Sequence, residues 1–292
     1  MSPSSGPPPM DRRPAGLTHP SRTPSRQAYA RSFGGVADAY DRARPSYPAD
    51  VVAWLLGDQP RRVLELGAGT GKLTGVLLSA GHEVLATEPD PAMVERLVVA
   101  HPDVAVARAG AEQIPAATRA VDAVVVAQAL HWFDLDAALP EMARVLRPGG
   151  TVGLVWNIMD TRIPWVRRLR TLMDAAAEAP TEDVAAVEAS GLFAPFEAET
   201  FRFWQPLDRE SLGALVSSVS AVAVRNEAGR AEVLAAADAL YDEYGRGHDG
   251  MLLPYVTYAY RSTALAPAGG ADGAVAVDRD DVDTDSLLID FR

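Results

Sequence analysis

The chain has 292 residues, 48% of them hydrophobic, which is enough apolar material for one large core or two smaller ones. Its formal net charge of −12 at pH 7 excludes a basic footprint for nucleic acid across the chain as a whole and disfavours an anionic membrane surface. Cysteine is absent and only five histidines occur, so disulfides, thiolate nucleophiles and Cys-ligated metals are excluded and we expect no metal site.

The two ends of the chain differ in composition from its middle. Residues 1–25 are rich in Pro, Ser and Arg and lack the apolar region of a secretory signal, while residues 265–292 are acidic and rich in Gly and Ala. Both are predicted to be disordered tails. No apolar run approaches the ~18 residues that a membrane span needs. We expect a cytoplasmic protein, a monomer or homodimer, with one folded domain over residues 26–264.

Short apolar runs alternate with amphipathic stretches in the first half of this domain, a pattern typical of a sheet covered by helices. Five strands are predicted, at residues 61–67, 82–90, 104–110, 121–130 and 151–157, and helical stretches follow the first, second and fourth of them. The run at 121–130 is apolar throughout, which predicts a central position in the sheet.

The period of the pattern changes after residue 158. Residues to about 190 have a helical pattern, and in residues 196–207 apolar and polar side chains then alternate with a period of two. Two further helical stretches precede a last alternating strand at 252–260. Two late strands after five parallel ones predict a Rossmann-like, doubly wound α/β sheet of seven strands with an antiparallel edge, and with helical insertions after the fifth strand.

The stretch VLELGAGTGKLT, residues 63–74, places three glycines at the end of the first predicted strand. A P-loop would need a hydroxyl residue after Lys72 and a glycine at position 66, but Leu73 and Leu66 stand there. A dinucleotide-binding loop counted from Gly67 would need its third glycine where Lys72 stands, so that interpretation is weak. What remains is E-x-G-x-G-x-G, with Glu65 inside the strand.

Two carboxylates accompany this loop. Glu65 stands two residues before the turn, where a carboxylate suits a ligand with a cationic ammonium group better than a pyrophosphate. Glu88 follows the second predicted strand, 21 residues after Gly67, where it could accept hydrogen bonds from two ribose hydroxyls. S-adenosylmethionine offers an ammonium group, a ribose and an adenine, and is the ligand that this combination favours.

Five motifs in order resemble those of the class I S-adenosylmethionine-dependent methyltransferases: VLELGAGTGKLT, VLATEPDPAMVERL, AGAEQIP, VDAVVVAQALHWFD and EMARVLRPGG. The chain is most similar to the small-molecule branch, methyltransferase type 11, which includes trans-aconitate methyltransferase-like proteins. The resemblance covers residues 28–262. It implies S-adenosylmethionine as cofactor, S-adenosylhomocysteine as its product, and an N-terminal helical lid within FGGVADAYDRARPSYP.

The resemblance also assigns cofactor contacts by position. The loop 67–71 would surround the methionine part, with Glu65 near its ammonium group, and Glu88 would hold the ribose. The remaining contacts would flank the adenine, meet the donor methyl at the end of the fourth strand, or close the site from the lid. The cofactor-binding set is Glu65, Gly67, Ala68, Gly69, Gly71, Glu88, Pro89, Ala111, Glu112, Gln128, Ala129, Tyr40 and Arg44.

His131 is the one histidine that the pattern places at the carboxyl edge of the sheet, directly after the fourth predicted strand. It could act as a base or orient the acceptor, or only shape the cavity; His248 is a weaker second candidate, and His82 and His101 are interpreted as exposed. Tyr47, Trp132 and Trp156 are predicted to contact the substrate. The region 158–250 is predicted to form a cap on the acceptor side, rich in aromatic and other apolar residues and containing arginines (Met159, Trp165, Phe201, Trp204, Arg162, Arg167, Arg168 and Arg170).

The leading hypothesis is transfer of a methyl group to a carboxylate or hydroxyl oxygen of a small metabolite. Transfer to nitrogen or carbon, and a cofactor-binding protein of this fold that transfers no methyl group, stay open as alternatives. A nucleic-acid methyltransferase is disfavoured by the net charge and by the sequence AQALHW, which stands where an N/D-P-P-Y motif would be expected.

Overall fold

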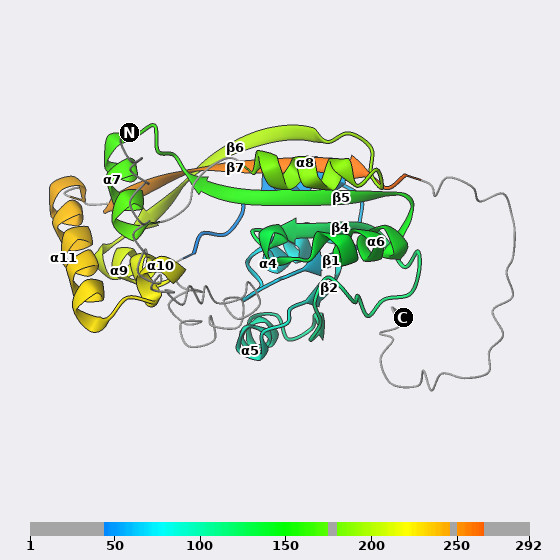
Figure 1. Ribbon diagram of the computed structural model, residues 1–292, viewed down its shortest axis with the longest axis horizontal. Helices are drawn as coiled ribbons and strands as arrows, with labels where there is room; N and C mark the ends of the chain where they lie inside the picture. The colour runs from blue at the N-terminus through cyan, green and yellow to red at the C-terminus, as the bar shows by residue number, and fades with distance from the viewer. Residues whose placement is uncertain (1–43, 175–179, 246–249, 266–292) are drawn as a thin grey trace, which may run out of the picture.

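The computed structural model describes residues 44–174, 180–245 and 250–265 (Figure 1). Seven strands in these ranges form one sheet in the order β3-β2-β1-β4-β5-β7-β6. Their bounds are β1 (Arg62–Leu66), β2 (Glu83–Thr87), β3 (Ala105–Ala107), β4 (Val121–Ala127), β5 (Leu146–Met159), β6 (Glu197–Leu207) and β7 (Met251–Thr263).

The pairing of the strands confirms the predicted doubly wound α/β sheet. Strands β1 to β5 pair in parallel, with β4 central between β1 and β5. Strand β7 runs antiparallel to both of its neighbours, β5 and β6. Strand β7 therefore lies one position inside the edge of the sheet, and β6 forms the edge itself. After β5 the chain first passes to this outer strand and then returns through β7.

Helices cover both faces of this sheet, and the alternation of side chains along β1 shows how. Val63 packs in one cluster with α3 (Ala49–Leu56) and α4 (Lys72–Ser79). Leu64 and Leu66, which point to the opposite face, pack with α6 (Leu135–Val145) and α8 (Thr181–Ala189). On the α4 side, Leu97 of α5 (Pro91–Ala100) packs with Ala86 of β2. Glu65 alternates with Leu64 and therefore faces α4.

A second hydrophobic core lies at the end of the sheet toward which β5 runs, where the cap helices gather (Figure 1). These helices are α7 (Pro164–Met173), α9 (Arg209–Ser217), α10 (Ser220–Ala223) and α11 (Glu227–Tyr244). Helix α7 contributes Val166, Leu169 and Met173, which share one face at helical spacing. The ends of β6 and β7 enter this core as well, so the cap is packed directly against the carboxyl end of the sheet.

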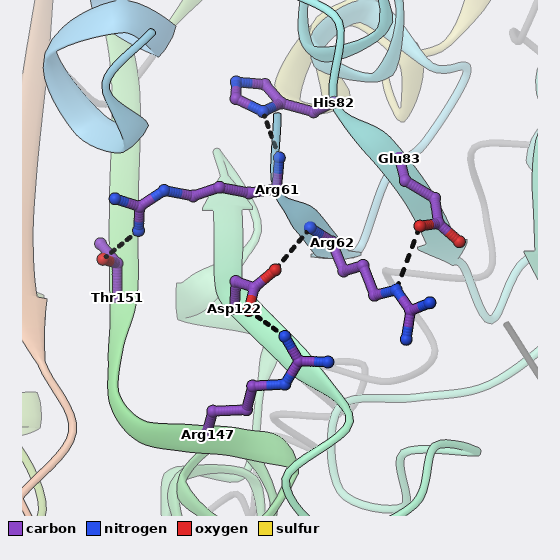
Figure 2. Close-up of polar contacts among 7 residues, drawn as sticks. All are labelled: Arg61, Arg62, His82, Glu83, Asp122, Arg147 and Thr151. Atoms are coloured by element: carbon purple, nitrogen blue, oxygen red, sulfur yellow. Dashed lines mark hydrogen bonds and ion pairs between the residues drawn. The ribbon is translucent and has the colours of Figure 1, made fainter. Parts of the chain in front are cut away.

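Polar contacts join the strands at their opposite, amino ends (Figure 2). The carboxylate of Asp122 accepts a hydrogen bond from the backbone N–H of Arg62 at 2.9 Å and pairs with Arg147. The backbone N–H of Arg61 donates to Nδ1 of His82 at 3.2 Å. The expected exposed position of His82 was wrong: its ring is buried, because it turns back over Arg61 after the turn at Gly81.

Several predictions made for the ends of the chain fall outside the described residues. These are the tail 1–25, nearly all of the tail 265–292, Tyr40 and His248. Of the expected helical lid, residues 44–48 are described; they are not helical and lead directly into α3. Among the described helices, each is too short or too polar to cross a membrane.

Candidate active site

A cavity of about 620 Å³ opens at the carboxyl ends of the parallel strands. Its wall is formed by the loop after β1 (residues 67–70), the ends of β4 and β5, the segment 44–47 and the cap helices. Open α/β sheets bind ligands at this edge. Nine of the residues predicted from the sequence line it together: Glu65, Gly67, Ala68, Gly69, Gln128, Arg44, Tyr47, His131 and Trp156.

Glu65 is the buried acid of this cavity. Its Oε2 accepts a hydrogen bond from the Thr74 hydroxyl at 2.6 Å, one turn into α4. Burial raises the pKa of Glu65 to about 8; the Thr74 hydrogen bond opposes this rise, and the charge of Glu88 adds to it. A carboxyl group held this way is ready to ionise when a cation enters the cavity, since an adjacent positive charge would lower its pKa again.

The glycine loop shows why each glycine is needed. A Cβ at Gly67 would lie 2.6 Å from the Cβ of Ala129, and a Cβ at Gly71 would lie 2.7 Å from the ring of His101. Gly69 has a φ of +58° with nothing within 4 Å of a Cβ built there, and it lines the cavity. Two glycines are therefore required by packing within the protein, and Gly69 keeps space open on the cavity side.

The expected exposed position of His101 was wrong. Its ring is half-buried beneath the loop, where Nε2 lies 3.0 Å from the carbonyl oxygen of Gly71. The nearby hydroxyl of Thr70 is buried and has no hydrogen-bond partner among the described residues. Because a buried polar group without a partner is unfavourable, Thr70 marks the loop as a place where a polar ligand or water belongs.

Glu88 directly follows β2 and supports the same loop. Its Oε2 accepts a hydrogen bond from the backbone N–H of Gly69 at 3.0 Å, and its Oε1 accepts one from the N–H of Asp90 at 2.9 Å. Burial raises the pKa of Glu88, while these two backbone hydrogen bonds oppose the rise. Each carboxylate oxygen has a further lone pair, so the arrangement is compatible with the predicted ribose contact.

The end of β4 is held in an unusual backbone conformation. Gln128 has a φ of +56°, and its Nε2 donates to the carbonyl oxygen of Asn157 on β5 at 2.9 Å. The next turn, η2 (Leu130–Trp132), presents His131 to the cavity, with its ring 4.7 Å from the ring of Trp132. No sequence pattern indicates that Asn157 anchors this end of β4, because the contact joins the ends of two separate strands.

The remaining predicted residues are not part of the cavity wall that the described residues form; they lie around it. Ala111 and Ala129 are buried in the core beneath it, and Pro89 is exposed. Oε1 of Glu112 accepts a hydrogen bond from the backbone N–H of Asp134. Gly71, Glu88 and Trp132 also lie outside the wall. The cofactor or substrate contacts expected of all these residues stay predictions.

The cap contributes fewer of its predicted residues to the cavity than the sequence pattern indicated. Of the residues predicted for the region 158–250, Met159 and Arg170 line the cavity. Arg162 and Arg168 pair instead with Asp160 and Glu243, Trp204 is 59% exposed on β6, and Trp165 stacks on Tyr244. Sequence reasoning missed the wall residues Thr70, Tyr255, Asn157 and Met173, and also Thr74, the partner of Glu65.

These features define an enzyme-like site for a ligand that carries a cationic group, at the carboxyl edge of a Rossmann-like sheet. A family model described as a methyltransferase domain matches residues 64–154. The chain is 40% identical over 245 residues to an uncharacterised methyltransferase of Mycobacterium tuberculosis, which covers 82% of this chain and 99% of that protein. The chain belongs to the class I S-adenosylmethionine-dependent methyltransferases.

Other relatives are more distant. The chain is 34% identical over 158 residues to malonyl-[acyl-carrier protein] O-methyltransferase of Methylococcus capsulatus, covering 49% of this chain and 58% of that protein. A structure described as a type II methyltransferase from Anaeromyxobacter dehalogenans matches with a TM-score of 0.56 at 24% identity, over 76% of this chain and 97% of that one. Phosphoethanolamine N-methyltransferase 2 of Haemonchus contortus, solved with S-adenosylmethionine, matches with a TM-score of 0.51 at 15% identity, over 82% and 60%. At these identities, the structural matches show the shared fold.

The cofactor of the family is S-adenosylmethionine, and the residues present fit it. Glu65 supplies a buried carboxylate for a cationic group, and Thr70 supplies a buried hydroxyl with no partner among the described residues. Gly69 leaves space that any side chain would fill. When bound, this cofactor supplies a methyl group that is electrophilic because it is attached to a positively charged sulfur. The enzyme is a methyltransferase.

Proposed function

We propose that the enzyme transfers the methyl group to a carboxylate oxygen of a small metabolite. The observation that carries this proposal is that Arg44 and Tyr255 both line the cavity, with the charge of Arg44 acting on the Tyr255 hydroxyl. Burial raises the pKa of the Tyr255 hydroxyl, and the positive charge of Arg44 opposes that rise. The tyrosine therefore remains a neutral hydrogen-bond donor close to a guanidinium group, and together they suit an anionic acceptor.

The distribution of charge around the cavity supports the same acceptor. Arg44 and Arg170 are partly buried in the wall, among apolar residues such as Trp156 and Met173. Among the acidic wall residues from the end of α7 and from α8, Asp174 and Glu182 are exposed, and Asp183 alone is partly buried, against two partly buried arginines. Exposed charges are screened by water and salt, whereas partly buried ones are screened much less. The inner wall therefore attracts an anion with an apolar body.

A carboxylate acceptor also matches the chemistry of the side chains. A carboxylate is already ionised at neutral pH, so no residue has to remove a proton from it. The tasks left to the protein are to position the acceptor and to exclude water. In this account Arg44 and Tyr255 hold the acceptor, and His131 orients it from the opposite turn. The relative from Methylococcus capsulatus is named as an O-methyltransferase, which supports oxygen as the acceptor atom.

The test follows the label from S-adenosylmethionine carrying a tritiated methyl group. The purified enzyme is incubated with this donor and a filtered extract of small molecules, and the products are treated with alkali. A methyl ester releases its label as volatile methanol, whereas N-methyl, C-methyl and ether products keep it. We expect volatile label. Label that survives alkali would contradict the proposal, as would cofactor binding without any transfer.

Two arginine variants make the test specific to the site. Arg44→Gln should lower kcat/KM for the acceptor by roughly 10–100-fold, the equivalent of one charge-assisted hydrogen bond. Arg168→Gln is the matched control, because Arg168 pairs with Glu243 on the surface and lies outside the cavity wall. Equal rates for the two variants would show that Arg44 does not hold the acceptor.

A further inference from the structure

Asn157 lies at the end of β5, where three separate segments meet. Its Nδ2 donates to the carbonyl oxygen of Ser46 at 3.1 Å, and its Oδ1 accepts from the Thr257 hydroxyl on β7 at 2.7 Å. Its backbone carbonyl oxygen accepts from Nε2 of Gln128 at 2.9 Å. The side chain is 8% exposed and belongs to the wall of the cavity. One residue thus connects the chain entering α3, the end of β4 and β7.

The segment that Asn157 holds is a wall of the active site. Arg44 and Tyr47 line the cavity on either side of Ser46. The hydroxyl of Ser46 also makes a long contact of 3.4 Å with the carbonyl oxygen of Lys72, at the start of α4 behind the glycine loop. Residues 44–48 belong to no helix or strand, and the carbonyl oxygen of Pro48 accepts a hydrogen bond from the backbone N–H of Val51 at the start of α3. The segment is held by side-chain contacts, among them the packing of Tyr47 against the core around α3 and the partly buried hydrogen bond from Asn157 to Ser46.

We infer that Asn157 is a positioning residue, which holds segment 44–48 against the cavity and so makes cofactor binding depend on that segment being in place. The carbonyl oxygen of Ser46 fixes which end of the amide faces it: it can only accept, so it requires Nδ2 and leaves Oδ1 to accept from the Thr257 hydroxyl. This inference does not depend on which acceptor the enzyme uses.

The substitution Asn157→Asp separates this role from a general effect on folding. An aspartate keeps the acceptor for Thr257 but, when ionised, has no proton to donate to Ser46. When protonated, it can donate again, and burial favours the protonated form. Cofactor binding by this variant should therefore be weakened at pH 8 and should recover at pH 5.5, which is still above the pI of about 4.9.

The measurement is the Kd for S-adenosylhomocysteine by calorimetry, expressed as the ratio of variant to wild type at each pH. This ratio removes the pH dependence that both proteins share through Glu65. We expect binding roughly 10–30-fold weaker at pH 8 and within about threefold of wild type at pH 5.5. The matched control is Asn226→Asp, because Asn226 only caps α11, far along the chain, and aspartate caps equally well.

Hydrogen exchange provides an independent readout. In Asn157→Asp at pH 8, the backbone amides within residues 45–52, apart from Pro45 and Pro48, which have none, should exchange faster than in wild type, while those of β1 should be unchanged. If Asn157→Asp does not fold, Thr257→Val and Thr257→Ser serve instead: the valine should weaken binding about three- to tenfold and the serine should restore it. A variant-to-wild-type ratio that is independent of pH, or faster exchange at 45–52 with unchanged affinity, would overturn the inference.

Discussion

The protonation state of Glu65 is the most specific property of the site at the residue scale. Its pKa of about 8 keeps the carboxyl largely protonated at neutral pH in the ligand-free protein. Contact with a cationic ammonium group favours the ionised form. Cofactor binding at pH 7 should therefore release close to one proton, and affinity should increase as the pH rises toward 8.

Calorimetry with S-adenosylhomocysteine in two buffers of different ionisation enthalpy measures this proton directly. In Glu65→Gln the release should disappear and binding should weaken by roughly 10–100-fold. Identical apparent enthalpies in both buffers for the wild type would show that Glu65 does not ionise on binding.

The same pKa shift sets a pH dependence of stability, and its sign follows from the direction of the shift. The folded-state pKa of Glu65 is raised above the ordinary value of 4.5, so folding favours the protonated form. Its contribution is fully present below about pH 4.5 and is lost as the pH rises through about 8. The free energy of unfolding of the ligand-free protein should therefore fall less over this window in Glu65→Gln than in wild type, as denaturant titrations at several pH values can measure.

Steady-state kinetics can distinguish an orienting role of His131 from a role as general base. If His131 orients an acceptor that is already ionised, His131→Gln should raise KM about tenfold and leave kcat nearly unchanged, because the lost contact is shared by ground and transition states. Steady-state rates with an identified acceptor measure both constants. A fall in kcat of roughly 10²–10⁴-fold with constant KM would instead show a general base and a hydroxyl acceptor.

Positions in the cavity wall that come from one strand and its loop could be predicted from the sequence, and contacts between distant segments could not. Glu65 and Gly69 line the cavity as predicted, because their spacing along one strand and turn is itself the signal. Asn157 and Tyr255 were missed because their partners lie on other strands, so only the folded sheet brings them to the cavity. The prediction that His82 is exposed was wrong because the sequence does not show that its ring folds back over Arg61.

At the scale of elements, the glycine loop allows a matched comparison. Gly69 and Gly81 both have positive φ, +58° and +86°, and at both positions a Cβ would meet nothing within 4 Å. Alanine at either position should lower the free energy of unfolding by about 1 kcal/mol, because it must adopt a left-handed conformation. Only Gly69 lines the cavity.

Gly69→Ala should therefore weaken binding of S-adenosylhomocysteine by more than about tenfold, while Gly81→Ala should bind normally. Calorimetry and thermal denaturation of both variants provide the two quantities. Equal affinities would mean that the open space at Gly69 is not ligand space.

The strands were predictable because buried parallel strands read as short apolar runs, such as residues 121–127. The place of β7 between β5 and β6 was not, since the order of the late strands depends on pairing between segments that are far apart along the chain. The helical pattern after residue 158 also did not show that α8 packs on the face of the sheet while α7 packs in the cap.

At the scale of the whole molecule, residues of both the sheet and the cap line the cavity, and we propose that the sheet supplies the cofactor side and the cap the acceptor side. Ligand that binds only the folded state stabilises it by about 2.7 kcal/mol at a concentration of 100 times Kd. Because residues of both layers line one cavity, we expect the cofactor product to protect the sheet and the cap together from hydrogen exchange, rather than the loop after β1 alone.

The most direct test of the central claim is calorimetric titration of the wild-type protein with S-adenosylhomocysteine and, separately, with NAD. The site built from Glu65, the loop 67–71 and Glu88 should bind S-adenosylhomocysteine at one site per chain, with a Kd on the order of micromolar, which corresponds to about −8 kcal/mol. NAD should give no heat of binding, because the loop lacks a glycine where Lys72 stands and presents a carboxylate to the ligand. Binding of NAD without binding of S-adenosylhomocysteine would contradict the account.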